Sequence, residues 1–226
     1  MAAGGCESKA FQTRPLSVAI SWHDRCYLNN SVKRRFSLFV SLLLIAFAAG
    51  KTQAHAQTSM IISTADQRIA VFHGDQLVAQ YPVSTSKYGL GDRSQSYETP
   101  LGIFTVASRI GEGAPEGAVF KERRMTGEVV RPNAPGRDAI VTRILQLRGL
   151  TNGAAHAYDR GIYIHGTPAE SQLGRPASYG CIRMRSRDIV RVFAEAPVGT
   201  KIAIIKTPIA RVLARAATAG HRLAAN

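Results

Sequence analysis

The sequence predicts a mainly β domain, a sandwich or partly closed barrel of mixed sheets with one or two short helices. Short runs rich in β-branched and aliphatic residues recur across residues 60–206 and are separated by turn residues, which is typical of strands joined by turns. One segment of this region has the apolar spacing and the end signals of a helix. Strands are expected at residues 60–63, 68–73, 77–84, 102–108, 140–147, 161–165 and 198–206.

The first three strands are expected to form a meander. Residues 64–67 and the turn His73-Gly74-Asp75-Gln76 are short and polar, so each strand can fold back on the one before it. Residues 109–138, by contrast, are rich in glycine, proline and charge. Long loops of this kind are often functional covers or are simply disordered, and we expect a flap over a cleft.

The predicted helix runs from about Arg187 to Ala196. Ser186 precedes it as the expected N-cap, and Asp188 lies in the first turn, where a carboxylate favours the positive end of the helix dipole. We expect the helix to pack its apolar face on the sheet. Ile189, Val190 and Phe193 form that face, and Pro197 is the expected stop of the helix.

The two ends of the chain differ from the domain between them. In residues 1–56, Lys33-Arg34-Arg35 precedes an apolar run over 36–49, and Ala54-His55-Ala56 has the small-x-small pattern of a signal-peptidase site. The run is shorter than the roughly 20 residues of a membrane span, so a permanent anchor is the second reading and no membrane span is expected after cleavage. A true start near residue 32 would give an ordinary signal peptide.

Three segments follow from these signals: an extension with a signal peptide to residue 56, a folded domain over 57–206, and a basic alanine-rich tail over 207–226. The tail, with Arg211, Arg215 and Arg222, is expected to be a surface helix, a frayed end or a weak contact with anionic surfaces. The protein is therefore predicted to be exported to the periplasm or cell envelope.

The chain is strongly basic, with 29 Lys and Arg against 15 Asp and Glu and a net charge of +14. A basic protein outside the cytoplasm is drawn toward anionic polymers. Nucleic acid is the usual partner for such a charge, but predicted export argues against it. A soluble basic surface without a polyanionic partner explains the charge nearly as well.

One cysteine, Cys181, remains after the predicted cleavage, and His165 lies sixteen positions before it. A lone cysteine is more often a small buried residue than a nucleophile. Here the preceding Gly180 permits a tight turn that exposes the sulfur, and an imidazole within reach could take the thiol proton and return it to a leaving amine. The pair predicts acyl transfer.

Further groups complete this predicted site. The carbonyl of Gly166 could orient His165, and backbone N–H groups of Tyr179, Gly180 and Cys181 are expected to stabilise an oxyanion. No metal or cofactor is expected, because the processed chain has one cysteine, no histidine pair at ligand spacing and no glycine-rich phosphate motif.

Four motifs together resemble the L,D-transpeptidase catalytic domain family, the cysteine enzymes that remodel peptidoglycan. The resemblance covers residues 59–206 and places the motifs in the family's order. One departure is Tyr179, where many members carry histidine, and its expected contribution is through the backbone. The motifs are Thr99-Pro100-Leu101-Gly102, His165-Gly166-Thr167, Ser178-Tyr179-Gly180-Cys181-Ile182-Arg183-Met184 and Pro197-Val198-Gly199-Thr200.

The resemblance implies a fold of this family's type and a peptidoglycan reaction. Cys181 would attack a stem tetrapeptide, release D-alanine and pass the acyl group to an amine, with His165 as base and Gly166 orienting it. Substrate contacts are expected from Arg183, Ser178, Thr167 and Tyr163, although Arg183 could equally brace the cysteine loop by an ion pair.

Two other functions stay open at this point. Water could resolve the same acyl-enzyme, giving an L,D-carboxypeptidase or endopeptidase, or the domain could bind peptidoglycan without chemistry. Stem peptides are the expected partners in every case, with an envelope protein as a further acceptor.

Overall fold

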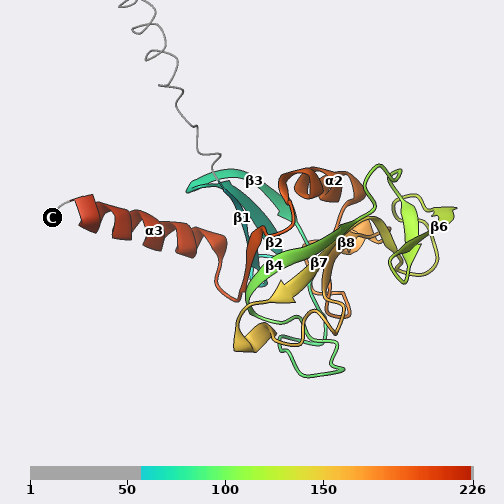
Figure 1. Cartoon of the computed structure of the whole chain (residues 1–226), viewed down its shortest axis with the longest axis horizontal. Coiled ribbons are helices and arrows are strands. Elements are labelled where there is room, and N and C mark those ends of the chain that lie inside the picture. The colour runs from blue at the N-terminus through green and yellow to red at the C-terminus, as the bar shows by residue number, and fades with distance from the viewer. Residues whose placement is uncertain (1–56, 225–226) are drawn as a thin grey trace, which may run out of the picture. The chain divides into compact units, whose positions relative to one another are not determined.

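The computed structural model describes residues 57–224, and they form ten strands and two α-helices, labelled as in Figure 1. The predicted signal peptide and start position lie outside the described residues. The strands are β1 (Thr58–Ser63), β2 (Arg68–His73), β3 (Gln76–Pro82), β4 (Gly102–Ile110), β5 (Ala118–Lys121), β6 (Arg124–Val129), β7 (Ile140–Gly149), β8 (Tyr163–Gly166), β9 (Ile182–Met184) and β10 (Lys201–Ile205). The helices are α2 (Ser186–Glu195) and α3 (Ile209–Ala224), with short 3-10 turns at Asn152–Ala154 and Glu170–Gln172.

All ten strands belong to one mixed sheet. Its path is β3-β2-β1-β10-β4-β7 and continues through β8 to β9, while the β5–β6 hairpin pairs with the first residues of β7. β1 with β10 and β8 with β9 are parallel, and the remaining pairs are antiparallel. The predicted mainly β fold with mixed pairing is therefore confirmed, and the first three strands form the expected meander.

The two ends of this path meet without forming a ladder. Ser84, just after β3, exchanges two backbone hydrogen bonds of 3.0 Å with Arg183 in β9. A second isolated bridge joins Ser86 to Ser178. The sheet thus curls toward closure, and the seam between its ends lies beside β9.

The core lies between the inward faces of the curled sheet and α2. Alternate residues of the strands point inward, as the pleat requires, and Ile189, Val192 and Phe193 of α2 pack against them. Val192, not the predicted Val190, completes the buried face of the helix. Residues 57–224 bury thirty hydrophobic residues in all, twenty-one of them in this cluster, enough for an independent domain.

The start of α2 differs from the prediction by one residue. Ser186 is the first helical residue, and its buried hydroxyl accepts a hydrogen bond from Thr142 at 2.8 Å instead of capping the helix. The backbone N–H of Ser186 donates to a carboxylate oxygen of Glu170 at 3.0 Å. A carboxylate from another segment therefore satisfies the helix end and its dipole.

Residues 109–138 are not the irregular loop that their composition predicts. They contain the hairpin of β5 and β6, which extends at the end of the molecule opposite α3 (Figure 1). Every residue of β6 is exposed, so the strand lacks an apolar face that would reveal it in the sequence. Glu122 and Arg123 form its turn at φ of 51° and 65°. That the segment acts as a flap stays a prediction.

The tail contains a helix, which was one of the expected outcomes. Ile209 is buried against Ala70 and Phe72 on the face of the sheet away from α2, and its N–H donates to Asp66 at 2.7 Å. The rest of α3 extends away from the sheet (Figure 1). Neither helix among residues 57–224 has the length and apolar character needed to cross a membrane.

A β-bulge in β7 shapes the region of the sheet next to β8. The register shifts between Val141 and Ile144, and Thr142 at the bulge has φ of 72°. This conformation is unfavourable for a β-branched residue. Its hydroxyl accepts from the Gly117 N–H at 2.9 Å and donates to Ser186, which offsets part of the strain. Bulges of this kind re-aim neighbouring side chains.

The strain at Thr142 predicts that a glycine variant is more stable than an alanine variant, the reverse of the usual order in a strand. Thr142→Gly and Thr142→Ala both lose the hydroxyl, but only glycine relieves the positive φ, so the glycine variant should be more stable by about 1 kcal/mol. Urea unfolding of both variants measures this difference. At Thr105 in β4, which has no positive φ, the same two substitutions should give the usual order, with alanine more stable. The bulge strain is absent if both positions behave alike.

Candidate active site

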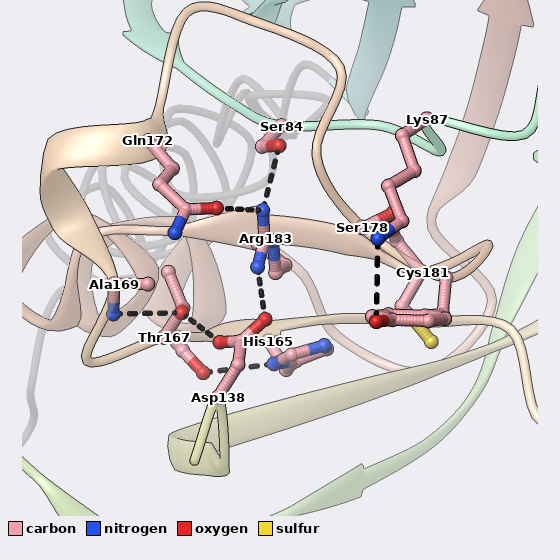
Figure 2. A network of polar contacts seen from close by, with 12 residues as sticks. Ser84, Lys87, Asp138, His165, Thr167, Ala169, Gln172, Ser178, Cys181 and Arg183 are labelled. Carbon is pink, nitrogen blue, oxygen red and sulfur yellow. Dashed lines mark hydrogen bonds and ion pairs between the residues drawn. The ribbon is translucent and has the colours of Figure 1, made fainter. Parts of the chain in front are cut away.

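His165 and Cys181 come together through the parallel pairing of β8 and β9. His165 is opposite Arg183, and Cys181 directly precedes β9. Since residues two apart on a strand point to the same face, Cys181 lies diagonally across from His165, with Cα atoms about 8 Å apart from the strand spacing and rise. In the view of Figure 2, the His165 ring points toward the side on which the Cys181 sulfur lies.

His165 is held as a neutral imidazole with one free nitrogen. Its Nδ1 lies 2.8 Å from the carbonyl oxygen of Gly166 (Figure 2). A carbonyl only accepts, so Nδ1 carries the proton and Nε2 presents a lone pair. Burial lowers the pKa of His165, and the bond to Gly166 and the charge of Asp138 oppose that shift. The ring is therefore an available base at neutral pH.

Gly166 is glycine because β7 comes too close for a side chain. A Cβ at this position would lie 2.6 Å from the carbonyl oxygen of Val141 and 3.1 Å from the Cβ of Thr142, both in the bulge. A larger residue would push β8 away from β7 and move the carbonyl that holds His165. The bulge, Gly166 and His165 thus form one structural unit.

Cys181 rests as a neutral thiol. Burial raises the pKa of Cys181 to about 11, and the backbone of Tyr163 acts in the opposite direction. The sulfur donates a hydrogen bond to the Gly161 carbonyl at 3.3 Å. The residue is partly exposed and lines a cavity of about 470 Å³. The nucleophile is thus reachable but needs a base to become a thiolate.

The turn before Cys181 is fixed by two hydroxyl groups. Ser178 donates to the Cys181 carbonyl at 2.6 Å and accepts from the Gly180 N–H at 3.2 Å. Thr99, from the predicted Thr99-Pro100-Leu101-Gly102 motif, donates to the Gly180 carbonyl at 2.9 Å and accepts from the Ser86 N–H at 2.9 Å. Gly180 itself has φ of 115°, which requires glycine. Three segments distant in sequence therefore hold the sulfur in place.

The backbone donors predicted for an oxyanion are not equivalent. The N–H of Gly180 is engaged by Ser178, whereas those of Tyr179 and Cys181 have no hydrogen-bond partner within residues 57–224. The two unengaged groups are therefore the better candidates. Ser178 is buried and its hydroxyl is used inside the turn, so its contact with a substrate stays a prediction.

The burial and the partners of Arg183 favour a bracing role over a substrate-binding role. Only 2% of the residue is exposed. One terminal nitrogen pairs with the Asp138 carboxylate, and the other donates to Ser84 Oγ at 3.1 Å and Gln172 Oε1 at 3.4 Å (Figure 2). Thr167 also donates to Asp138, at 2.5 Å. Two of the four predicted substrate contacts, Arg183 and Thr167, are thus committed to an internal network.

Tyr163 is half-buried on the same face of β8 as His165. Burial raises the pKa of its phenol, and the guanidinium of Arg123 beside it acts in the opposite direction. Arg123 belongs to the turn of the β5–β6 hairpin. The predicted flap segment therefore reaches the site through its basic turn.

Sequence reasoning missed the charged residues that shape the site. Asp138 lies at the end of the segment rich in glycine, proline and charge. The buried pair of Arg160 and Asp92, 2.9 Å apart, joins residues 68 positions apart in the sequence. Arg160 also donates to the carbonyls of Ser96 and Glu98 at 2.9 and 2.6 Å. No local pattern marks such long-range pairs. No group of three or more potential metal ligands occurs among the described residues.

Comparison with known proteins establishes the family. A family model described as the L,D-transpeptidase catalytic domain (YkuD) matches residues 57–204, more than half of the chain. The chain belongs to the L,D-transpeptidase family. The matched range includes both strands of the site and the cysteine turn.

The relatives of this chain are distant. The probable L,D-transpeptidase YbiS of Escherichia coli (strain K12) is 28% identical over 157 residues, 66% of this chain and 45% of YbiS. The putative L,D-transpeptidase YqjB of Bacillus subtilis (strain 168) is 26% identical over 172 residues, 75% of this chain and 85% of YqjB. The chain thus spans less than half the length of YbiS. A solved L,D-transpeptidase from Mycobacterium smegmatis aligns with a TM-score of 0.42 and 19% identity, over 66% of this chain and 59% of that one.

The raised pKa of Cys181 predicts slow alkylation at neutral pH. At pH 7 only a small fraction of Cys181 is thiolate, and the greater nucleophilicity of a basic thiolate offsets only part of that loss in rate. Iodoacetamide should therefore label Cys181 about 20-fold more slowly at pH 7 than it labels a cysteine peptide. The rate should rise about tenfold per pH unit up to pH 10. Peptide mass spectrometry at Cys181 separates it from the other two cysteines. A plateau between pH 6 and 8 would instead reveal a thiolate paired with an imidazolium.

Asp138 should act on both stability and the His165 ring. Asp138→Asn leaves Arg183 buried without its counter-ion, which should destabilise the protein by about 2 kcal/mol, less than for a fully buried pair because Asp138 is 29% exposed. The negative charge raises the pKa of His165, so its removal should lower that pKa further. Urea unfolding and an NMR titration of the ring measure the two effects.

A nearby exposed ion pair provides the control. Glu128→Gln removes the partner of Arg137, 2.6 Å away and largely exposed, and should change stability by less than about 0.5 kcal/mol without moving the His165 titration. If Asp138→Asn behaved like this control, the ion pair would not brace the site.

Proposed function

We propose that this protein is a peptidoglycan L,D-transpeptidase in which Cys181 is the nucleophile and His165 the general base. The observation that carries the proposal is the placement of a neutral imidazole, with Nε2 free, on the same strand face as a partly exposed thiol. A thiol with a raised pKa and an imidazole with a lowered pKa both rest uncharged. Such a pair transfers its proton as the sulfur attacks.

The first half-reaction forms the acyl-enzyme. The sulfur of Cys181 attacks the carbonyl carbon of the third residue of a stem tetrapeptide, and His165 takes the thiol proton. Backbone N–H groups of Tyr179 and Cys181 stabilise the oxyanion. The bond between the carbonyl carbon and the nitrogen of D-alanine then breaks, and His165 returns the proton to that nitrogen.

The second half-reaction transfers the acyl group to an amine. The acceptor nitrogen attacks the thioester, the carbon–sulfur bond breaks, and the released thiolate recovers a proton through His165. The acceptor is the side chain of a diaminopimelate residue in another stem, a free D-amino acid or a lysine of an envelope protein. Water at the same position would give the L,D-carboxypeptidase or endopeptidase reaction.

Export fits this substrate. The apolar run at residues 36–49 and the pattern at Ala54-His55-Ala56 support delivery to the cell envelope, where stem peptides are found. The net charge of +14 favours contact with the anionic wall polymer. We place the protein in the periplasm or cell envelope on these grounds.

One assay separates the reactions. The purified protein is incubated with disaccharide tetrapeptide, and mass spectrometry follows the products. Release of D-alanine with dimer formation supports transpeptidation, tripeptide without dimer indicates hydrolysis, and binding without turnover indicates a non-catalytic module. Cys181→Ala should abolish release of D-alanine, and His165→Gln should slow it by at least about 100-fold.

His73 provides the matched control for the base. It is exposed and pairs with Glu195 at 2.8 Å, away from the site. His73→Gln should retain wild-type turnover, and circular dichroism should show that all three variants are folded. Equal turnover in His165→Gln and His73→Gln would exclude His165 as the base.

A further inference from the structure

A cavity of about 470 Å³ opens beside the sulfur, and the catalytic residues alone do not explain its walls. Segments 94–97 and 156–162 form two sides of it, and Tyr179 and Cys181 form a third. Arg160 and Asp92, both at least 93% buried in their side chains, join the first two segments. The cavity is therefore a built feature of the fold with Cys181 at its edge.

Three tyrosines cluster at this cavity although nothing in the core requires them there. Tyr88, Tyr97 and Tyr179 are 48%, 59% and 55% exposed, and their ring centres lie 5.4 to 5.8 Å apart. Tyr97 and Tyr179 line the cavity itself. An exposed group of aromatic rings is typical of a binding surface.

The chain itself shows which ligand chemistry these rings accept. The Lys87 ammonium lies 4.6 Å from the ring centre of Tyr179 and 5.2 Å from that of Tyr88, and it is 3.3 Å from the Tyr179 hydroxyl. These distances are those of cation–π contacts. Tyr97 has no cation over its ring within the described residues. One ring of the cavity wall thus already holds an ammonium, and its neighbour is available for another.

Beyond the Lys87 ammonium, which the rings of Tyr88 and Tyr179 already hold, the ionisable groups that line the cavity favour a cation as well. Asp159 lines it, is exposed, and has no ion-pair partner among residues 57–224. Arg160, the arginine of the wall, is already neutralised by Asp92. An unpaired carboxylate beside aromatic rings attracts an ammonium group and repels the carboxylates of a donor stem.

We propose that this cavity is the site of the acyl acceptor, and that Asp159 with the ring of Tyr97 selects an amine; this inference rests on the proposed transpeptidase function. The acceptor arrives as an ammonium and gives one proton to solvent. Its neutral nitrogen attacks the thioester on Cys181, a carbon–nitrogen bond forms and the carbon–sulfur bond breaks. The second proton passes through His165 to the sulfur.

Product partition tests the proposal. With disaccharide tetrapeptide as both donor and acceptor, the ratio of dimer to tripeptide reports how often an amine, rather than water, resolves the acyl-enzyme. Asp159→Asn and Tyr97→Leu should each lower this ratio by about three- to tenfold, the range expected from one ionic or cation–π contact. The rate of the first release of D-alanine should change by less than about twofold, because acylation precedes acceptor binding.

Asp75→Asn is the matched control. Asp75 is an exposed carboxylate in the turn between β2 and β3 and does not line this cavity, so its loss should leave the ratio unchanged. The proposal is overturned if Asp159→Asn and Tyr97→Leu slow D-alanine release and leave the ratio unchanged, because the cavity would then hold the donor.

A binding measurement separates this proposal from the catalytic one. In the Cys181→Ala protein with labelled tyrosines, 1,5-diaminopentane should shift the ring signals of Tyr97 and Tyr179, and Asp159→Asn should weaken that binding about three- to tenfold. No shift in a protein whose wild type releases D-alanine would overturn the acceptor site alone. Binding without any D-alanine release would overturn the transpeptidase proposal and leave an amine-binding cavity.

Discussion

The buried ion pair between Arg183 and Asp138 holds the site together. Through its backbone Arg183 joins β9 to Ser84 at the seam of the curled sheet, and through its side chain it joins β9 to the end of the hairpin segment. At the seam, isolated bridges and not a ladder of paired strands join Ser84 to β9. Breaking the pair leaves the buried charge of Arg183 uncompensated, so this contact fixes where β9, and hence the cysteine before it, lies relative to Asp138, while the ladder between β8 and β9 sets its position opposite His165.

Burial drives the side chains of both proposed catalytic residues, Cys181 and His165, toward their neutral forms. It raises the pKa of Cys181 and lowers that of His165, because a low-dielectric site disfavours either charge. The resting site therefore holds a thiol and an imidazole, and charge develops only as a carbonyl is attacked. A neutral thiol is also a poor target for oxidants, which react with thiolates. Under the proposed export, this would suit a cysteine that has no disulfide partner among residues 57–224.

The sequence predicts what depends on local pattern and misses what depends on long-range pairing. The helix α2 and the inner strands are predictable because their apolar spacing records one buried face. β6 is exposed throughout, and its turn uses Glu122 and Arg123 instead of the usual Asn-Gly, so no signal marks the hairpin. Asp138 acquires its role only when the fold brings it to Arg183, 45 positions later in the sequence. The site motif is readable, and the bracing that positions it is not.

Tyr179 takes part in the cysteine turn through its backbone, whereas its side chain forms part of the cavity wall. Its neighbours fix the backbone, with Thr99 and Ser178 bonded to Gly180 on either side, so the position before the glycine contributes a backbone N–H whatever its side chain. The side chain is consequently free to face the cavity, where it is 55% exposed and contacts two other tyrosines. The side chain at position 179 can therefore change the wall of the cavity without altering the turn that carries the thiol.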